Sequence, residues 1–173
     1  PCYVATASKF LGSSPVRVCT AIDFPLGTST TRIRVAQAVE AVENGADEID
    51  LALNVGMIKA GDYQGLRRDI EDVVAALKGR AKVKAIIQTE LLNEEEKVKA
   101  CITAKMAGVD FLKISASAGS GGVKLEDIKL ARQAVGPQIN IKADGGIKTY
   151  GRALALLEAG ATRIGASRSV AIV

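Results

Sequence analysis

The chain has no histidine among its 173 residues, and aromatic residues make up only 3% of it. The lack of histidine excludes Ser-His-Asp and Cys-His catalysis and metal sites with histidine ligands. Acid–base chemistry must therefore use lysine, aspartate, glutamate, tyrosine, cysteine or water. The scarcity of aromatic rings leaves little surface on which nucleic-acid bases could stack, so we expect no nucleic-acid partner.

Cysteine is scarce as well, with Cys2, Cys19 and Cys101 spread along the chain and no C-x-x-C spacing. We therefore expect neither a disulfide framework nor a zinc site. Unpaired cysteines fit a protein of the reducing cytoplasm. No apolar run approaches the roughly 18 residues that a membrane span needs. Pro1-Cys2-Tyr3 is not the start of a signal peptide. The net charge of +4 is spread along a mixed, solvated surface. We predict a cytoplasmic protein without a membrane partner.

The sequence does contain a regular alternation of apolar strands and amphipathic helices. Strands are predicted at 16–24, 48–54, 83–88, 111–115, 139–142 and 163–165. Helices are predicted at 1–11, 31–44, 66–79, 93–107, 125–135 and 149–158, with a short terminal helix capped by Ser167. In the second helix the apolar residues at helical spacing are Ile33, Val35, Ala36, Val39 and Val42. This alternation favours a parallel sheet with right-handed crossovers.

Four glycines end predicted helices at a repeating interval. Gly45, Gly79, Gly108 and Gly160 stand where glycine can adopt the left-handed conformation, and Asp50, Lys84, Lys113 and Gly165 follow five residues later. The constant offset predicts matching heights for these four residues in their strands. Such a repeat of strand–helix units is typical of the α/β class and of a (β/α)8 TIM barrel, whose active site lies at the C-terminal strand ends. A doubly wound open sheet is the alternative, but no G-x-G-x-x-G follows the first strand.

Only six strands can be found, whereas a closed barrel of this type has eight. We therefore expect a single (β/α) barrel domain over residues 1–173 that is incomplete at its N-terminus, with the first one to two strands missing.

Two lysines stand at strand ends beside glycines. Lys113 precedes the run Gly119-Ser120-Gly121-Gly122, and Lys142 precedes Gly145-Gly146. The alternation of side chains along a strand places Asp50, Lys84 and Lys113 inside the barrel. A second ammonium nearby lowers the pKa of a lysine, and the neutral amine is a nucleophile. The functional interpretation is a Schiff-base enzyme with an interior carboxylate that moves protons. The alternative is that these groups form structural ion pairs.

Glycines also mark two candidate anion-binding turns. Gly145-Gly146 and Gly165-Ala166-Ser167 each lie between a predicted strand and a predicted helix. Backbone amides at such helix N-termini can bind a phosphate, and barrels commonly place this site after strands seven and eight. Ordinary glycine turns between strand and helix are the alternative.

At these residues the chain resembles the 2-deoxyribose-5-phosphate aldolase family, class I aldolases with a (β/α)8 fold. The matching segments are Val18-Cys19-Thr20, Phe24-Pro25-Leu26-Gly27, Asn44 to Asp50, Phe111-Leu112-Lys113, Lys142 to Ile147 and Arg163 to Ser167. The resemblance implies that Lys113 forms the Schiff base, Lys142 tunes its pKa and Asp50 relays protons. It also implies that Gly145, Gly146, Gly165 and Ser167 hold the phosphate, and that Lys84 and Cys19 line the pocket.

The implied reaction is the reversible cleavage of 2-deoxyribose 5-phosphate to glyceraldehyde 3-phosphate and acetaldehyde, without metal or cofactor. The implied partner is a small phosphorylated sugar, and we expect a homo-oligomer, dimer or tetramer. Two alternatives stay open: a catalytically impaired barrel that keeps only the scaffold and an anion site, and another Schiff-base sugar-phosphate lyase.

The chain departs from the family pattern at several positions around the pocket. Ile114-Ser115-Ala116-Ser117 replaces the usual Thr-Ser-Thr-Gly after the Schiff-base lysine, and Gln88 stands where the family usually has Glu. Asp144 replaces a Ser or Ala before the paired glycines, where a carboxylate repels phosphate and Arg168 could offset it. Altered substrate preference or reduced activity therefore stays open.

Overall fold

The structure is a computed structural model of the chain that describes residues 1–116 and 121–173. Ser117, Gly119 and Ser120, named above in the glycine-rich run and among the departures, lie outside the described residues. The chain divides into two compact units, residues 1–85 with 106–110, and residues 86–105 with 111–173. One domain over residues 1–173 stays a prediction.

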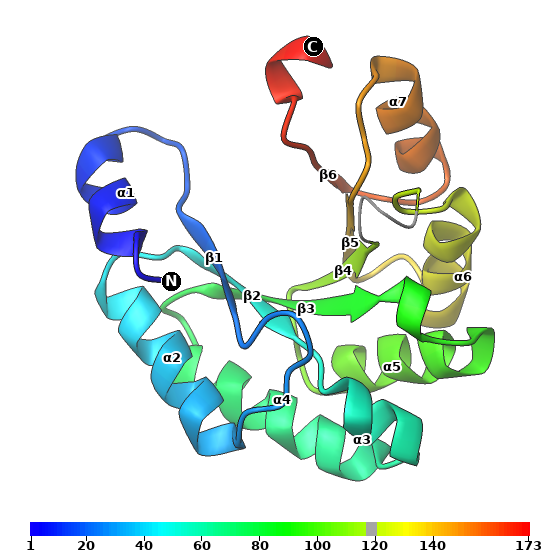
Figure 1. Cartoon of the computed structure of the whole chain (residues 1–173), viewed down its shortest axis with the longest axis horizontal. Coiled ribbons are helices and arrows are strands. Elements are labelled where there is room, and N and C mark those ends of the chain that lie inside the picture. Colours follow the sequence, from blue (N-terminus) through cyan, green and yellow to red (C-terminus); the bar gives the residue numbers. More distant parts are fainter. Residues whose placement is uncertain (117–120) are drawn as a thin grey trace. The chain divides into compact units, whose positions relative to one another are not determined.

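The first unit alternates short parallel strands with helices (Figure 1). Its elements are α1 (Val4–Leu11), β1 (Cys19–Ile22), α2 (Thr31–Glu43), β2 (Glu48–Ala52), α3 (Val55–Ala60), α4 (Tyr63–Leu77) and the first half of β3 (Lys82–Gln88). The strand order is β1-β2-β3, and β1 and β2 are parallel, with Ala21 beside Asp50. Every residue of β2 is buried. Helix α2 packs against β2, and α4 packs against α2.

The second unit repeats this pattern with the remaining strands. Its elements are the end of β3, a 3-10 turn (Thr89–Leu91), α5 (Glu94–Met106), β4 (Phe111–Ser115), α6 (Leu125–Val135), β5 (Asn140–Asp144), α7 (Tyr150–Glu158), β6 (Arg163–Gly165) and a 3-10 turn (Ser169–Ala171). Strands β4, β5 and β6 are parallel and follow one another in the sheet. Helices α6 and α7 pack against each other beside them (Figure 1).

Each predicted strand and helix is present in the part of the chain that the structure describes, but several bounds differ. Strand β2 ends at Ala52 rather than at 54, α4 begins at Tyr63 rather than at 66, and α1 begins at Val4 rather than at 1. Helix α3 lies between the predicted strand 48–54 and the predicted helix 66–79, where no element was expected; the side chain of Asn54 caps it by accepting from the Met57 amide. Strand β1 is shorter than the predicted 16–24. The terminal turn begins at Ser169 with Arg168 as its N-cap, so Ser167 is not the cap.

The buried face of α2 is also different from the expected one. Its buried residues are Arg34, Ala38 and Ala41, whereas Ile33 is exposed. An arginine can face the interior here because carboxylates from two other segments meet its guanidinium, as described below. The spacing of apolar residues alone does not predict a buried arginine that is paired with carboxylates.

The left-handed glycines predicted after the helices are present, with φ between +77° and +116° at Gly45, Gly79, Gly108 and Gly160. The constant five-residue offset does not give a constant height. In the second unit Lys113 lies beside Lys142, and Lys142 lies beside Arg163. Gly165 therefore stands two residues further along its strand, beside Asp144.

No helix among residues 1–116 and 121–173 has the length and apolar character that crossing a membrane requires.

Candidate functional site

The first unit contains a buried cluster of charges centred on Lys84. The Lys84 side chain has no exposed surface, and its Nζ lies 2.7 Å from Oδ1 of Asp50 and 2.6 Å from Oε2 of Glu48. Both carboxylates are almost fully buried. Because a lysine with two carboxylates cannot lose its proton cheaply, Lys84 is a fixed ammonium rather than a neutral nucleophile.

Cys19 belongs to the same cluster. Its Sγ donates to Oδ1 of Asp50 at 3.2 Å and accepts from Nζ of Lys84, also at 3.2 Å. Burial of the sulfur and the negative charge of Asp50 raise the pKa of the Cys19 thiol, although Lys84 opposes them. Burial alone would lower the pKa of Lys84, but the charge of Asp50 and the hydrogen bonds to Asp50 and Glu48 raise it. Cys19 is therefore a neutral thiol at neutral pH.

A second buried network fixes the segment that follows β1. The Arg34 guanidinium pairs with Asp69 on α4, donates to the Ala52 carbonyl at the end of β2, and has its Nε 3.3 Å from Oδ2 of Asp23. Asp23 in turn accepts from the Ser29 hydroxyl at 2.7 Å. The network ties the loop after β1 to the C-terminal end of β2, the strand that carries Asp50.

In the second unit, Lys113 and Lys142 are direct neighbours in the sheet. The Nζ of Lys113 lies 2.7 Å from Oδ2 of Asp144, with the Lys113 side chain 12% exposed and that of Asp144 29% exposed. The sequence analysis assigned Asp144 only to the phosphate turn. Asp144 also contacts the candidate nucleophile, Lys113.

Gly165 makes room for this arrangement. A side chain there would put its Cβ 2.6 Å from Oδ1 of Asp144 and 3.1 Å from Cε of Lys142. The two side chains therefore converge over the glycine. The cation next to Lys142 in the sheet, Arg163, lies over the ring of Phe111, with 4.4 Å from its Cζ to the ring centroid. Lys113, Lys142 and Asp144 therefore lie together towards the C-terminal ends of β4 and β5, whereas Arg163 stacks on the first residue of β4.

The glycine turns after β4 and β5 pack backbone against backbone. The amide of Val123 donates to the Gly145 carbonyl at 3.1 Å, and a Cβ on Gly122 would lie 2.7 Å from that oxygen. A Cβ on Gly145 would lie 2.1 Å from the carbonyl oxygen of Ala116. Both added Cβ atoms would overlap a backbone oxygen, so Gly122 and Gly145 have a packing role whatever they bind.

A cavity of about 170 Å3 opens between the turn after β5 and the end of β6. Its lining consists of Asp144, Gly145, Gly146, Ile147, Lys148, Gly165, Ala166, Ser167 and Arg168. All four residues predicted to hold phosphate are present in it. The lining also brings in Lys148, which the sequence analysis did not name and which stands two residues after the paired glycines.

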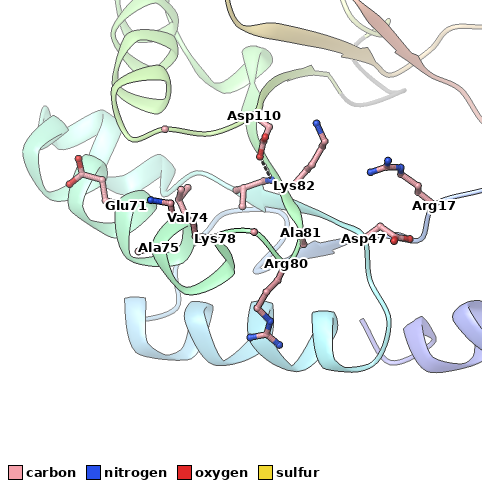
Figure 2. A pocket seen from close by; sticks show the side chains of 13 residues that line it. Arg17, Asp47, Glu71, Val74, Ala75, Lys78, Arg80, Ala81, Lys82 and Asp110 are labelled. Atoms are coloured by element: carbon pink, nitrogen blue, oxygen red, sulfur yellow. Dashed lines mark hydrogen bonds between the residues drawn. The ribbon is translucent and has the colours of Figure 1, made fainter.

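A larger cavity, of about 710 Å3, lies in the first unit at the opposite ends of the strands. Figure 2 shows its charged side chains, which come from α4, the turn after it, the start of β3 and the segments before β1, β2 and β4. Asp110 in its wall accepts from the Val83 amide at the start of β3. The candidate catalytic lysines and Asp50 are not in its lining. Since barrel active sites form at C-terminal strand ends, volume alone does not identify the site.

The structure thus brings the predicted residues together in two groups. Cys19, Asp50 and Lys84 form one group in the first unit. Lys113, Lys142 and the four phosphate residues form the other in the second unit. Neither the contact of Glu48 with Lys84 nor that of Asp144 with Lys113 was predicted from the sequence. Glu48 shares a strand face with Asp50, and that spacing was the available signal.

Comparison with known proteins adds independent information. The family model described as DeoC/LacD family aldolase matches residues 1–170. The deoxyribose-phosphate aldolase of Enterococcus faecalis is 52% identical over 173 residues, which are 100% of this chain and 79% of that protein. The deoxyribose-phosphate aldolase of a Thermoanaerobacter species is 51% identical over 175 residues and is covered to 78%.

Solved structures agree on the fold. The structure titled "QR15, an Aldolase" superposes with a TM-score of 0.89 at 36% identity, covering 99% of this chain and 76% of that one. The deoxyribose phosphate aldolase of Aeropyrum pernix, described as a tetramer, gives a TM-score of 0.86 at 24% identity over 99% of this chain and 73% of that one. The predicted (β/α)8-barrel fold class is confirmed.

Proposed function

Because the chain belongs to the DeoC/LacD aldolase family, we propose that it is a class I aldolase that reversibly cleaves 2-deoxy-D-ribose 5-phosphate to D-glyceraldehyde 3-phosphate and acetaldehyde. The observation that carries this proposal is 52% identity over the whole chain to a deoxyribose-phosphate aldolase. The paired strand lysines and the glycine-lined cavity beside them support it, since they are the parts that Schiff-base chemistry on a sugar phosphate needs.

In the proposed reaction the neutral amine of Lys113 attacks the C1 aldehyde carbon of the open sugar, and water leaves as the iminium forms. The iminium accepts the electron pair of the C2–C3 bond while the C3 hydroxyl loses its proton. Glyceraldehyde 3-phosphate departs and an enamine remains on Lys113. Protonation of the enamine at C2 and hydrolysis of the resulting iminium release acetaldehyde and regenerate the amine.

The other candidate residues have supporting roles in this proposal. Lys142, beside Lys113 in the sheet, favours the neutral amine by like-charge repulsion. Asp50 relays protons, and Lys84 and Cys19 line the pocket. The buried ammonium of Lys84 keeps the carboxylate of Asp50 ionised, as a proton acceptor must be. Gly145, Gly146, Gly165 and Ser167 hold the phosphate.

Borohydride trapping tests the proposal on the chain as given. Incubation with acetaldehyde and sodium borohydride should add one ethyl group to Lys113, detectable by peptide mass spectrometry. Lys113→Ala should abolish both the modification and the turnover of 2-deoxyribose 5-phosphate. Lys129→Ala is the matched control, because Lys129 is an exposed lysine on α6. A folded chain with no label on Lys113 and no turnover would favour the impaired-barrel alternative.

The ion pair between Lys113 and Asp144 is the observation that favours testing the two alternatives, an impaired barrel and another Schiff-base lyase. A carboxylate next to an amine stabilises its protonated form, which opposes nucleophilic attack. If labelling at Lys113 occurs without turnover of 2-deoxyribose 5-phosphate, another Schiff-base sugar-phosphate lyase is the better description. A panel of phosphorylated ketoses and aldoses then identifies its substrate.

We also propose a cytoplasmic homo-oligomer, dimer or tetramer, that works without metal or cofactor. Large apolar side chains on the surface of the first unit support self-association: Phe10 is 91% exposed and Val16 is 61% exposed. Light scattering at micromolar concentration checks the oligomeric state, and a monodisperse monomer would count against this proposal.

A further inference from the structure

Asp144 occupies a position from which one carboxylate contacts both halves of the substrate site. It is the last residue of β5, beside Gly165 on the neighbouring strand. Its Oδ2 lies 2.7 Å from Nζ of Lys113, and its Oδ1 lies over Gly165 at the edge of the cavity of about 170 Å3. We propose that Asp144 is a specificity-determining residue that weakens the preference for a phosphorylated substrate and favours one whose terminal group is an uncharged hydroxyl.

This inference rests on the proposed function, because it concerns the tail of the sugar that Lys113 would bind. A phosphate monoester carries a charge of roughly −1.5 to −2 at neutral pH. In the wall of the cavity, the cations that could receive it, Lys148 and Arg168, are exposed, whereas Asp144 is held on a strand end by its ion pair. Like charges repel more strongly where solvent is partly excluded. Among the charged side chains that line the cavity, the carboxylate is therefore held in place by an ion pair and the two cations are exposed.

The contact with Lys113 strengthens the effect at the step that matters. Lys113 must be neutral to attack a carbonyl, and loss of its proton removes the positive charge 2.7 Å from Asp144. Asp144 then faces the cavity with less compensation than before, at the moment when a phosphate would be bound there. A hydroxyl tail meets no such penalty, since it donates a hydrogen bond to a carboxylate. When Lys113 is neutral and able to attack, Asp144 therefore repels a bound phosphate dianion most strongly.

The test compares 2-deoxyribose 5-phosphate with 2-deoxyribose on the wild-type chain and on Asp144→Asn and Asp144→Ser. The quantity measured is the ratio of kcat/KM for the phosphorylated to the unphosphorylated sugar. We expect both variants to raise this ratio about tenfold or more, mainly through a lower KM for the phosphorylated sugar. Asp72→Asn, an exposed aspartate on α4, is the matched control and should leave the ratio unchanged.

A binding measurement makes the inference independent of turnover. Calorimetric titration with inorganic phosphate should give a Kd about tenfold lower for Asp144→Asn than for the wild type. The difference should shrink at 1 M salt, where the Debye length is about 3 Å. Arg168→Ala should change the phosphate Kd in the opposite direction.

Failure of the inference about Asp144 and failure of the proposed function give different results. Equal changes in kcat/KM for both sugars, or an unchanged ratio with an unchanged phosphate Kd, overturn the inference, because Asp144 would then act only through Lys113 or not at all. Failure of all variants to process either sugar overturns the proposed function. The phosphate titration then decides on Asp144 by itself, and a tighter Kd in Asp144→Asn supports its role in the cavity.

Discussion

The Nζ of Lys84 lies 2.7 Å from Oδ1 of Asp50, and neither side chain is more than 5% exposed. Glu48 contacts the same ammonium at 2.6 Å. Two buried carboxylates and one lysine carry a net negative charge, so the lysine is needed for the carboxylates to remain ionised inside the protein. The cluster is thus both a structural ion pair and a means of setting the protonation of Asp50.

Replacement of Lys84 by Met should destabilise the protein by about 3–5 kcal/mol, because two carboxylates would lose their shared buried cation. The loss should be largest at neutral and alkaline pH. Protonation of the two buried carboxylates at lower pH removes the charges that lack a cation, so the penalty should be smaller there. Urea unfolding at pH 8 and pH 5 measures this. Lys129→Met on the exposed side of α6 should change stability by about 0.5 kcal/mol or less, and an equal loss there would contradict the interpretation.

The three cysteines should react with iodoacetamide in the order Cys2, Cys19, Cys101. The thiolate is the nucleophile, so a raised pKa slows alkylation. Cys2 and Cys19 are both exposed residues, but desolvation of the Cys19 sulfur and the charge of Asp50 raise the pKa of Cys19, and burial raises the pKa of Cys101 to about 12. Peptide mass spectrometry of samples quenched during reaction at pH 8 gives the three rates.

Asp50→Asn supplies the internal control for this order. Removal of the carboxylate while Lys84 remains should lower the pKa of Cys19 and speed its alkylation about threefold or more, without changing the rate at Cys2. Alkylation of wild-type Cys19 as fast as that of Cys2 would show that the thiol is not held by Asp50.

Arg34 should be among the residues most sensitive to substitution in the first unit. Arg34→Leu removes a guanidinium that contacts Asp69, Asp23 and the Ala52 carbonyl, and should cost about 3–5 kcal/mol. Arg34→Lys should recover less than half of this, since one ammonium cannot reach the three acceptors. Arg32→Ala, on the exposed side of the same helix, should cost no more than about 0.5 kcal/mol. Chemical unfolding followed by far-UV circular dichroism measures the unfolding free energy of the three variants, and equal losses for Arg34→Leu and Arg32→Ala would contradict the prediction.

Alanine substitutions at Gly27 and Gly61 allow the stability cost of backbone strain to be distinguished from that of a steric clash. Both have left-handed φ, +65° and +73°. A Cβ on Gly27 would lie 2.6 Å from the Leu53 carbonyl oxygen, whereas nothing lies within 4 Å of one on Gly61. Gly61→Ala should cost about 1 kcal/mol, and Gly27→Ala at least about 2 kcal/mol more. Thermal unfolding of the two variants gives the difference, and equal melting temperatures would refute the contact.

Much of the fold follows from local patterns in the sequence. The predicted bounds of β4, α6 and β6 agree with the structure, because apolar runs there are framed by glycine, a charged first turn or a glycine-terminated helix. The capping of α5 was equally readable: Asn93 accepts from the Glu96 amide, and Glu96 accepts from the Asn93 amide. Helix α3 was missed because six residues that include Gly56 carry too little periodicity to be distinguished from a loop.

The sequence alone therefore determined the order of strands and helices, the glycine turns and the types of residue that stand at the strand ends, since these depend on chemistry within a few residues. Only the tertiary structure decided which charges meet. Arg34 and Asp69 are 35 positions apart, Lys84 and Asp50 are 34 apart, and Asp144 reaches Lys113 from the next strand. Pairing at such separations depends on strand register and on which side chains glycine leaves room for, as Gly165 does for Asp144 and Lys142. Periodicity in one segment carries no information about either.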